Sequence, residues 1–540
     1  MLLIDACLFV LLAVSRSIAH NAFSGPVPKE LGNLKELTVL SFGSNNFSGT
    51  LPPELGNLAK LEQIYINSCG LSGEIPSSFA NLRNMQTIVC KISGWASDSP
   101  FTGKIPDFIG NWSKLVSLRF QGNSFEGPIP SSFSNLTSLT SLLVHLWVRI
   151  SDIYNISSSL DFIRRMKNLT DLSLRNSLIT GNIPSDIGEY QELMTLDLSF
   201  NNLTGEIPSA LFNISSLTHL FLGNNSLSGN IPSQKSEKLQ TMWLKYLTIF
   251  CKDLSYNYLS GTFPSWVTSN LQLNLVANNF AFESSNSSVF PGLNCLQRNF
   301  LCNRNTPRYA KFAIKCGGKQ MIADNIVYET ENSSFSAASF NVTSTEKWAV
   351  SNVGLFSDRE DPSYVQNTLA QVTGTRTPEL YQTSRLSPGS LRYYGLGLEN
   401  GHYNISLLFA ETVFDDRSSQ TWKSLGKTLK LKDFDISKEA GGVNRAITKN
   451  FNAIVSENHL EIHLFWAGKG TCCIPKQGDY GPSISALSVV PDFVPTVSGI
   501  PPNAIHKKNR TGLIVGVAVP LGILVFIMIF TVFYIRKKDD

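Results

Sequence analysis

One pattern of apolar residues returns every 24 residues through much of the first half of the chain, and it constrains the fold more than any other feature. The apolar positions of one unit are repeated in the next: Leu193, Leu196, Leu198, Leu203 and Ile207 return as Leu217, Leu220, Leu222, Leu227 and Ile231. Neither a helical period nor a strand alternation persists across such a unit. A fixed interval in the twenties is typical of a solenoid, in which each repeat is one coil stacked on its neighbours.

The consensus of the unit, LxxLxLxxNxLxGxIP, is the pattern of leucine-rich repeats. Each coil is expected to contain a short strand, followed by an asparagine whose side chain hydrogen-bonds the backbone of the turn. That position is held by Asn45, Asn123, Asn201 and Asn225, and by Cys69 in one coil. Burying five apolar side chains between coils contributes on the order of 10 kcal/mol, most of it opposed by chain entropy. We therefore predict a leucine-rich-repeat solenoid over residues 21–290, with short parallel strands and an irregular or 3-10 outer face.

The residues that the repeat pattern leaves free are the candidates for function. Alternate side chains of each short strand are exposed on the concave face of such a solenoid. Aromatic and arginine residues are favoured at binding hot spots. The predicted ligand-binding residues on this face are Tyr65, Asn67, Arg119, Gln121, Arg175 and Phe221.

Both ends of the chain carry apolar segments. Residues 6–14 are apolar and are followed by the small residues Ser17 and Ala19, which predicts a signal peptide over residues 1–19. Residues 513–535 are uncharged, and as a helix they would be about 34 Å long, enough to cross a bilayer. We predict a juxtamembrane linker over 491–512, a transmembrane helix over 513–535 and a cytoplasmic stub over 536–540.

Asn-x-Ser/Thr acceptor sites precede the predicted membrane helix and indicate passage through the secretory lumen. Twelve are predicted to carry glycans: Asn46, Asn111, Asn135, Asn155, Asn168, Asn202, Asn213, Asn224, Asn286, Asn332, Asn341 and Asn404. They favour a single-pass type I protein of the plasma membrane, with the N-terminal region outside the cell. A net charge of +4 over 540 residues gives no reason to expect a nucleic-acid partner.

The cysteines favour disulfides over a metal site. Cys295 and Cys302 lie close together and are expected to form a cap or linker over residues 291–308, while Cys316, Cys472 and Cys473 are further disulfide candidates. Their connectivity is left open. No CxxC or histidine spacing accompanies them, so neither a metal nor a cofactor is expected.

Residues 309–490 have a different texture, with alternating or apolar runs separated by Gly and Pro, as in a β-sandwich. The segments "FAIKCGGKQ", "LRYYGLGLENGHYNISLLFAE", "LKDFDISKEAGG" and "EIHLFWAGKGTCCIPKQGDYGPSISALSV" resemble the malectin domain of plant leucine-rich-repeat receptor-like serine/threonine kinases. The repeats resemble the same family, and so does the order of repeats, malectin domain and membrane helix.

The resemblance implies a sensor of extracellular cues in the plant plasma membrane. Malectin binds a glucose disaccharide through aromatic rings, so the resemblance implies Tyr381, Tyr393, Tyr394 and Phe414 as carbohydrate-binding candidates. The chain departs from the family in lacking a sandwich strand before "LKDFDI" and the first coils of the solenoid. The missing strand is expected to leave an unpaired edge or a collapsed sheet.

No catalytic machinery is recognisable, and the chain is not expected to be an enzyme. It holds no glycine-rich phosphate loop, "HRD" or "DFG" motif of a kinase, and His402, His459 and His463 are expected to be structural. We expect a receptor-like protein that binds an extracellular peptide, protein or cell-wall glycan and signals through a co-receptor kinase. The alternatives are a cell-wall carbohydrate-binding anchor, or a fragment of a kinase whose ATP-dependent catalytic domain lies outside this sequence.

Overall fold

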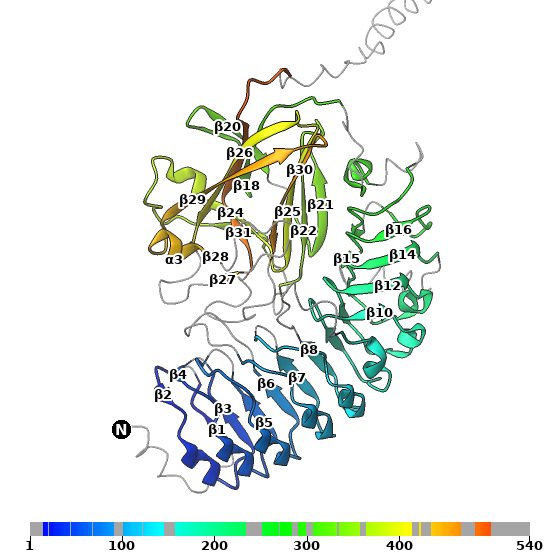
Figure 1. Ribbon diagram of the computed structural model, residues 1–540, viewed down its shortest axis with the longest axis vertical. Coiled ribbons are helices and arrows are strands. Elements are labelled where there is room, and N and C mark those ends of the chain that lie inside the picture. The colour runs from blue at the N-terminus through cyan, green and yellow to red at the C-terminus, as the bar shows by residue number, and fades with distance from the viewer. Residues whose placement is uncertain are drawn as a thin grey trace, which may run out of the picture.

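The structure is a computed structural model that describes residues 15–19, 21–43, 45–66, 69–90, 101–120, 123–144, 157–233, 251–268, 271–282, 290–298, 306–331, 334–356, 363–412, 421–422, 434–465 and 481–497. The described chain forms a curved solenoid followed by a β-sandwich that lies against the inside of the curve (Figure 1).

Short strands, one from each coil, line the inside of the solenoid as a single parallel sheet. Within the described residues this sheet has eleven strands, in chain order β1 (Ser15–Ser17), β3 (Val39–Ser41), β5 (Gln63–Tyr65), β6 (Thr87–Val89), β7 (Ser117–Phe120), β8 (Ser141–Val144), β9 (Asp171–Ser173), β11 (Thr195–Asp197), β13 (His219–Phe221), β15 (Cys251–Asp253) and β17 (Gln272–Asn274). In most of these strands an apolar residue points into the coil, and Leu40, Ile64 and Leu196 are at most 1% exposed there. The predicted concave ladder is confirmed.

The outer face consists of 3-10 segments, as predicted. They are η1 (Lys29–Asn33), η2 (Pro53–Asn57), η3 (Ser77–Asn81), η4 (Asp107–Asn111), η5 (Ser131–Asn135), η7 (Leu160–Ile163), η8 (Ser185–Glu189) and η9 (Ser209–Asn213). Seven of these eight follow a proline N-cap, and in η2 Pro52 has φ −61°. Neighbouring coils touch here, since a Cβ on Gly56 would meet the Ser78 carbonyl oxygen at 2.4 Å.

Asparagine side chains satisfy the backbone of the turns, as the repeat pattern predicts. Nδ2 of Asn225 donates to the carbonyl oxygens of Leu222 and Leu198, both at 3.0 Å, and so links two coils. Asn257 and Asn278 occupy the same position in later coils. In the Cys69 coil the thiol takes over, and its Sγ lies 3.5 Å from the Ile66 carbonyl oxygen.

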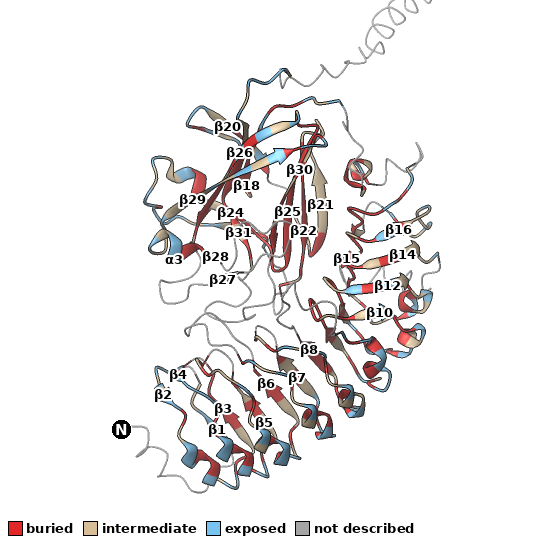
Figure 2. Ribbon diagram, viewed as in Figure 1, coloured by how far each residue is buried: buried red, intermediate tan, exposed pale blue. Residues whose placement is uncertain are grey.

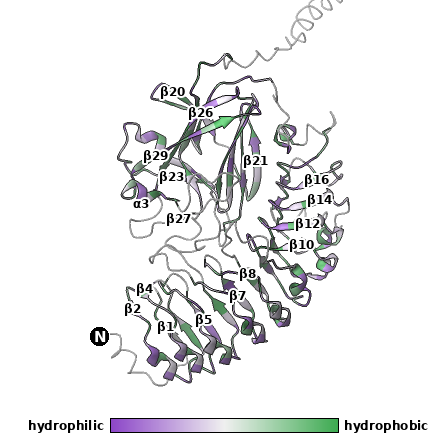
Figure 3. Ribbon diagram, in the orientation of Figure 1, coloured by the Kyte–Doolittle hydropathy of each residue, from purple (hydrophilic) through white to green (hydrophobic). Residues whose placement is uncertain are grey.

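A second ladder runs along one flank of the solenoid. Its parallel strands are β10 (Thr180–Asn182), β12 (Asn202–Glu206), β14 (Ser226–Asn230) and β16 (Tyr258–Ser260), with β2 (Ser24–Pro26) and β4 (Asn46–Ser48) in an earlier pair. Figure 3 shows hydrophilic residues along β12 and β14.

The end of the predicted signal peptide takes part in the first coil. Ser15–Ser17 pair with β3, and the Ile18 amide donates to the Ser41 carbonyl oxygen at 3.0 Å. The structure thus includes residues 15–18 in the repeat array, and the predicted signal peptide over residues 1–19 stays a prediction. Residues 1–14 lie outside the described residues.

The solenoid ends in the predicted cap region. The 3-10 segment η11 (Leu293–Leu296) carries Cys295, which is disulfide-bonded, whereas Cys302 lies outside the described residues. Phe290 packs 6.2 Å from the ring of Phe340 in the sandwich. The end of the solenoid therefore contacts the sandwich.

The predicted β-rich domain is a sandwich of two main sheets. One six-stranded sheet has the order β19 (Met321–Ala323), β20 (Ile326–Glu331), β18 (Phe312–Cys316), β32 (Ala486–Pro491), β26 (Gly401–Ala410) and β29 (Ala446–Val455). The four-stranded sheet has the order β21 (Ala338–Val342), β22 (Trp348–Val353), β25 (Ser390–Leu396) and β30 (His459–Phe465). The other elements are β23 (Val365–Asn367), β24 (Thr383–Leu386), β31 (Ser483–Ile484), β27 (Thr421–Trp422), β28 (Phe434–Asp435), η12 (Pro378–Tyr381) and α3 (Ile436–Ala440).

The six-stranded and four-stranded sheets enclose a core that includes Phe312, Trp348, Tyr393, Tyr403 and Phe409. The sheets have not collapsed, although β29 is the outer strand of its sheet among the described strands. The segment in which a family strand was expected to be missing lies mostly outside the described residues, and its Thr421–Trp422 pair with Phe434–Asp435.

The last described residues are tied back to the sandwich. Oε1 of Glu399 accepts a hydrogen bond from the Thr496 hydroxyl at 2.6 Å, and Oε2 accepts from the Thr496 amide at 2.9 Å. Phe493 stacks edge-on against Tyr403 at 5.5 Å. No helix among the described residues is long and apolar enough to cross a membrane, and the predicted span 513–535 lies outside them.

Candidate functional site

The concave ladder divides into an open part and a covered part. At the last outward position of each short strand, Ser41, Tyr65, Val89, Arg119 and Leu143 are half-buried. Further along, Ser173 is 9% exposed, Phe221 3%, and Asp253 and Asn274 0%. The change occurs because the sandwich lies over the later strands (Figures 1 and 2).

The covering surface is the outer face of the four-stranded sheet. Strand β21 contacts β15 and β17, and Phe221 and Cys251 of the solenoid cluster with Ala338 and Val353 of the sandwich. Tyr394 also packs into the apolar core that runs through the repeats. Figure 2 shows strands β22 and β25 of this sheet as buried.

Polar groups join the two parts at several points. Nη2 of Arg392 donates to Oδ1 of Asn224 at 2.7 Å, and its guanidinium lies 3.7 Å from the ring centroid of Tyr256. The Tyr256 and Tyr394 hydroxyls are 2.9 Å apart, and Nδ2 of Asn274 donates to Oγ of Ser351 at 2.8 Å. These contacts fix the register between the ladder and the sandwich.

A second group of contacts involves aromatic rings. Phe200 and Phe465 have ring centroids 4.2 Å apart, and the Arg175 guanidinium lies 4.9 Å from Phe200 and 5.0 Å from Phe465. His463 stacks on Phe200 at 6.4 Å, and its Nε2 lies 2.9 Å from Oγ of Ser390. Removal from water and the neighbouring Arg392 and Arg175 lower the pKa of His463 well below its usual value.

The carboxyl of Asp253 is buried on the covered part of the ladder. Oδ1 of Asp253 accepts from the Ser255 amide at 3.1 Å, whereas Oδ2 has no hydrogen-bond partner among the described residues. Burial raises the pKa of Asp253 to about 6, although the hydrogen bonds of Ser255 and the charge of Arg392 act the other way. Its neighbour Gly223 has no room for a side chain, since a Cβ there would lie 2.1 Å from Oδ2.

Some of the predicted ligand-binding residues lie on the open part of the ladder and others on the covered part. Tyr65 and Arg119 lie on the open part, and the Tyr65 hydroxyl donates to Oε1 of Gln63 at 3.1 Å. Arg175 and Phe221 are 8% and 3% exposed, so the expectation that they face solvent is corrected: the sandwich covers them. Asn67 and Gln121 lie outside the described residues.

The predicted sugar-binding rings are packed inside the protein. Tyr393 is 0% exposed in the sandwich core, and Tyr394 is 0% exposed against the repeats. Tyr381 is 4% exposed among small apolar residues, with its hydroxyl 3.2 Å from Oγ1 of Thr448. Their burial corrects the assignment of these three tyrosines as carbohydrate-binding candidates, and Phe414 lies outside the described residues.

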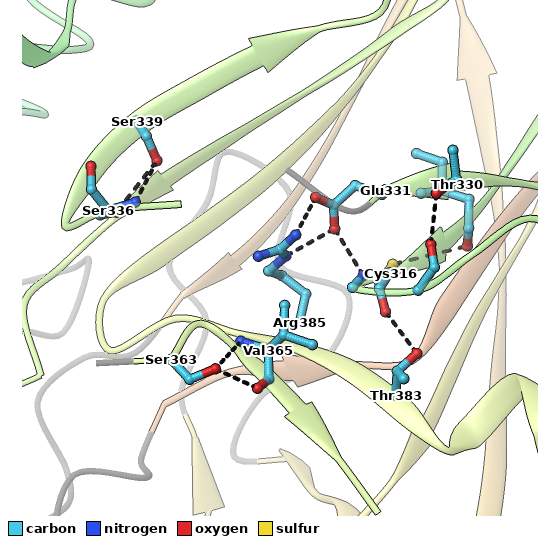
Figure 4. Close-up of polar contacts among 12 residues, drawn as sticks. Cys316, Thr330, Glu331, Ser336, Ser339, Ser363, Val365, Thr383 and Arg385 are labelled. Carbon is cyan, nitrogen blue, oxygen red and sulfur yellow. Dashed lines mark hydrogen bonds and ion pairs between the residues drawn. The ribbon is translucent and has the colours of Figure 1, made fainter. Parts of the chain in front are cut away.

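The sandwich also contains a buried ion pair between Glu331 and Arg385 (Figure 4). Nε of Arg385 donates to Oε2 of Glu331 at 2.8 Å, and its Nη2 pairs with Oε1. The Gly317 amide donates to the same Oε2 at 3.0 Å. Because burial outweighs the pairing with Arg385, the pKa of Glu331 is raised.

Cys316 beside this pair is buried and free, which corrects its assignment as a disulfide candidate. Burial raises the pKa of its thiol to about 12, so it is no nucleophile at neutral pH. Cys472 and Cys473 lie outside the described residues. No cluster of three metal-binding side chains occurs among the residues that are described.

Among the predicted glycan sites, the structure separates exposed from covered positions. Asn46, Asn111, Asn135, Asn168, Asn202, Asn213 and Asn404 are exposed. Asn224 is different, because its Oδ1 accepts from Arg392 and its Nδ2 is buried against the sandwich. Asn341 lies half-buried on β21, and Asn155, Asn286 and Asn332 are outside the described residues.

Sequence reasoning missed the interdomain contact. Its signals were present: Arg392 lies in a largely apolar strand, and Gly223 stands where two neighbouring coils have the side chains of Arg175 and Ser199. Neither signal identifies its partner without the fold.

Family models match both parts of the chain. The malectin domain model matches residues 310–487, and the leucine-rich repeat model matches residues 36–58, 60–82, 114–136, 192–214 and 216–234. The chain therefore joins a leucine-rich-repeat solenoid to a malectin domain.

Similar proteins agree with this class. A probable LRR receptor-like serine/threonine-protein kinase of Arabidopsis thaliana is 51% identical over 298 residues, 53% of this chain and 29% of that protein. Another from the same plant is 37% identical over 404 residues, 73% of this chain and 36% of that protein. The plant peptide hormone receptor RGFR1 in complex with RGF2 is 29% identical at a TM-score of 0.40, over 48% of this chain and 39% of that one.

The chain carries leucine-rich repeats and a malectin domain, and it is similar to the ectodomain region of leucine-rich-repeat receptor-like serine/threonine kinases of Arabidopsis thaliana. It spans about a third of the length of the curated relatives described above. The family models that match it are the repeat and the malectin domain, and neither is a kinase.

Proposed function

We propose that this protein is a plant cell-surface receptor component that recognises an extracellular peptide or protein on the open part of its concave ladder. One observation carries the proposal: described residues of the malectin domain cover Arg175 and Phe221 on the later coils, whereas Tyr65, Val89 and Arg119, at the last outward positions of β5, β6 and β7, are half-buried. A curved parallel ladder with an aromatic, an arginine and aliphatic side chains at its centre suits an extended ligand.

The positions of the glycan acceptors support the same face. Asn111, Asn135 and Asn213 are the last residues of η4, η5 and η9, on the outer side of the solenoid. Asn46 and Asn202 lie on the flanking strands β4 and β12. None of the exposed sites in the described solenoid lies within the concave strands β3, β5, β6, β7 and β8, so glycans would leave the open ladder accessible.

We further propose that the chain is anchored by residues 513–535 with its repeats outside the cell, and that it signals through a partner kinase. The clamp of Glu399 on Thr496 supports this arrangement, because it gives the chain a fixed exit from the malectin domain toward that segment. The identity of the partner kinase is a matter for experiment.

The proposal is tested by placing a glycan on the open ladder of the full chain purified in detergent. The double substitution Thr87→Asn with Val89→Thr creates an acceptor site between β5 and β7. The control Lys35→Thr creates one at Asn33, the outer position equivalent to Asn111. Extracellular wash fluid from plant tissue is passed over each protein, with and without protease or glycosidase treatment.

We expect the ladder glycan to abolish binding, the outer glycan to leave it unchanged, and protease to destroy the bound component. Binding that survives the ladder glycan would contradict the proposed site. Loss on glycosidase treatment would instead support a carbohydrate-binding anchor.

A further inference from the structure

Exposed apolar side chains gather at one end of the malectin domain. Eight large apolar side chains are exposed among the described residues, and four of them belong to this end. They are Ile322 on β19, Val327 on β20, Ile454 on β29 and Val494 just after β32, with exposed fractions of 70%, 48%, 68% and 91%. We call these four the exit-end residues. A single exposed apolar side chain is ordinary, whereas a group of them marks a contact surface.

The strand register brings the exit-end residues to the end of the six-stranded sheet at which the chain leaves it. Strand β32 runs outward to Pro491, and its neighbours β18 and β26 both begin at that end. Strand β20 is parallel to β18, so Val327 and its cross-strand partner Ile322 also lie there. Ile454 pairs with His402, at the start of β26. Figure 1 shows the β20 hairpin at the same end of the domain as the departing C-terminal segment.

The exit-end residues lie on both sides of the point where the chain leaves. In the sheet order, β20 is two strands from β32 on one side, and β29 is two strands from it on the other. At about 4.8 Å between neighbouring strands, β20 and β29 are roughly 20 Å apart. Apolar side chains spread over such a width suit a broad surface better than a small molecule.

The register also gives the inclination of the sheet to such a surface. Val327 is level with Val489 of β32, whereas Ile454 lies three residues nearer the exit, which is roughly 10 Å along a strand. A flat surface that touches both side chains therefore meets the strands at an incline.

The length of chain beyond the sandwich identifies the surface. Fifteen residues, 498–512, separate Val497 from the apolar segment 513–535, which we propose as the membrane anchor. A flexible tether of this length has a root-mean-square extension of roughly 20 Å. The clamp of Glu399 on Thr496 fixes the point from which it starts. The bilayer is thus held close to the exit-end residues, and tethering favours even a weak contact.

Charged side chains at this end carry both signs. Arg308 and Lys311 precede β18, whereas Asp324 follows β19 and Asp492 follows β32, and all four are exposed. The acidic residues balance the basic ones, so anionic lipid headgroups gain no attraction here. Apolar contact with the boundary between headgroups and acyl chains is the interaction that remains.

We propose that the exit end of the malectin domain rests on the outer surface of the bilayer, with the exit-end residues inserted among the lipid headgroups. This inference rests on the proposed anchoring by residues 513–535 and adds how the domain is held above the membrane. Because the solenoid is docked on the malectin domain, the contact would also fix the direction in which the open ladder faces.

The test reconstitutes the natural full chain into phosphatidylcholine nanodiscs that contain a phosphatidylcholine with a diazirine at the headgroup end of its acyl chain. Irradiation attaches this lipid to nearby protein groups, and peptide mass spectrometry locates the adducts. Leu369, 99% exposed in the loop after β23, is the matched control. Thr373 of the same loop pairs with Arg445, just before β29 begins, so the loop lies at the opposite end of the sheet.

We expect lipid adducts on residues 513–535 and on the peptides that carry the exit-end residues, and at least tenfold fewer on the peptide that carries Leu369. The double substitution Ile322→Ser with Val327→Ser should reduce adducts on the hairpin at least fivefold, because serine does not hold it among the headgroups. Leu369→Ser and added phosphatidylserine should leave the pattern unchanged. Far-UV circular dichroism checks that each variant keeps its fold.

Adducts on residues 513–535 without adducts on the exit-end peptides would overturn the inference and leave the anchoring in place. Equal labelling of the Leu369 peptide, adducts that persist on the substituted hairpin, or adducts that require phosphatidylserine would overturn it as well. If residues 513–535 carry no adducts, the proposed anchoring falls and the inference falls with it.

Discussion

At the scale of single residues, neighbouring asparagines of the same coil have unrelated tasks. Asn225 lies inside the solenoid and links two turns, whereas Asn224, with φ +56°, turns outward and accepts a hydrogen bond from Arg392. Asparagine tolerates this left-handed conformation better than most residues. Both lie in the sequence Asn-Asn-Ser. This glycan acceptor pattern gives no indication that the malectin domain contacts Asn224.

Asn224 is expected to remain unglycosylated once the domains have docked, because its Nδ2 is buried against the malectin domain. Asn202, exposed one coil earlier, is expected to carry a glycan. Glycopeptide mass spectrometry of the full chain purified in detergent measures both occupancies. High occupancy at Asn224 would show that the domains are apart when glycans are added.

Asp253→Asn is expected to change how stability depends on pH. The folded-state pKa of Asp253, about 6, exceeds the ordinary value of 3.8, so the natural carboxyl favours the folded state at low pH and loses this contribution as pH rises from about 4 to 6. Because asparagine does not titrate, the variant does not lose this stability as pH rises. Relative to the natural chain, the variant should gain up to about 3 kcal/mol between pH 4 and pH 7.

Denaturant titrations of both proteins at several pH values measure this gain, and a difference that does not vary with pH would contradict it. His463→Gln is the matched variant of opposite sign. Because burial lowers the pKa of His463, its neutral form favours the folded state above pH 6.5, and that contribution is lost as pH falls. The glutamine variant should therefore gain relative stability toward acid pH.

At the scale of elements, strand β25 explains why the tyrosines are buried. Its residues alternate, with Leu391 and Tyr393 pointing into the sandwich core and Arg392 and Tyr394 pointing toward the repeats. A strand packed on both faces is buried throughout, as the burial of all seven residues shows. Adjacent aromatics therefore reflect two packed surfaces here and give no exposed platform for a sugar ring.

Strands β20 and β24 are joined by the Glu331–Arg385 pair, which is at most 1% exposed. Glu331→Gln leaves the Arg385 charge buried without its counter-ion and should destabilise the malectin domain by roughly 3–5 kcal/mol. The control Glu439→Gln breaks the largely solvated pair with Lys449 and should cost below about 1 kcal/mol. Chemical denaturation followed by tryptophan fluorescence compares them, and equal costs would refute the structural role of the buried pair.

At the scale of the whole molecule, the malectin domain and the repeats form one unit through an interface that is polar at several points. Cys251 reports on it, because its thiol lies on the ladder beneath Ala338 and is buried. Burial raises the pKa of this thiol to about 12, which protects it further from alkylation.

Ala338→Arg should separate the domains, since a long charged side chain cannot be accommodated among Phe221, Cys251 and Val353. We expect iodoacetamide to label Cys251 in this variant but not in the natural chain, while Cys69 and Cys90 stay protected inside the coils. Ile322→Arg, on an exposed part of the malectin domain, is the control and should leave Cys251 unlabelled. Rapid labelling of Cys251 in the natural chain would argue against docking in solution.

The sequence by itself determined the architecture of each part. A 24-residue period predicts stacked coils because one coil cannot bury its own apolar face. Within a coil, local geometry alone lets Asn45 hydrogen-bond the turn and Pro52 precede a 3-10 segment. The malectin domain was likewise recognisable from its strands. These are short-range properties, repeated or contained within single segments.

Only the tertiary structure decided which part of the ladder is open. Phe221 and Tyr65 occupy equivalent positions in their coils, yet one is covered and the other half-exposed, because a domain more than 100 residues further along the chain folds back onto the later coils. The same contact buries Tyr394, occupies Asn224 and shifts the pKa of Asp253. Repeats that follow the same sequence pattern therefore differ in the exposure of equivalent residues. Long-range packing causes this difference, and a local pattern does not encode it.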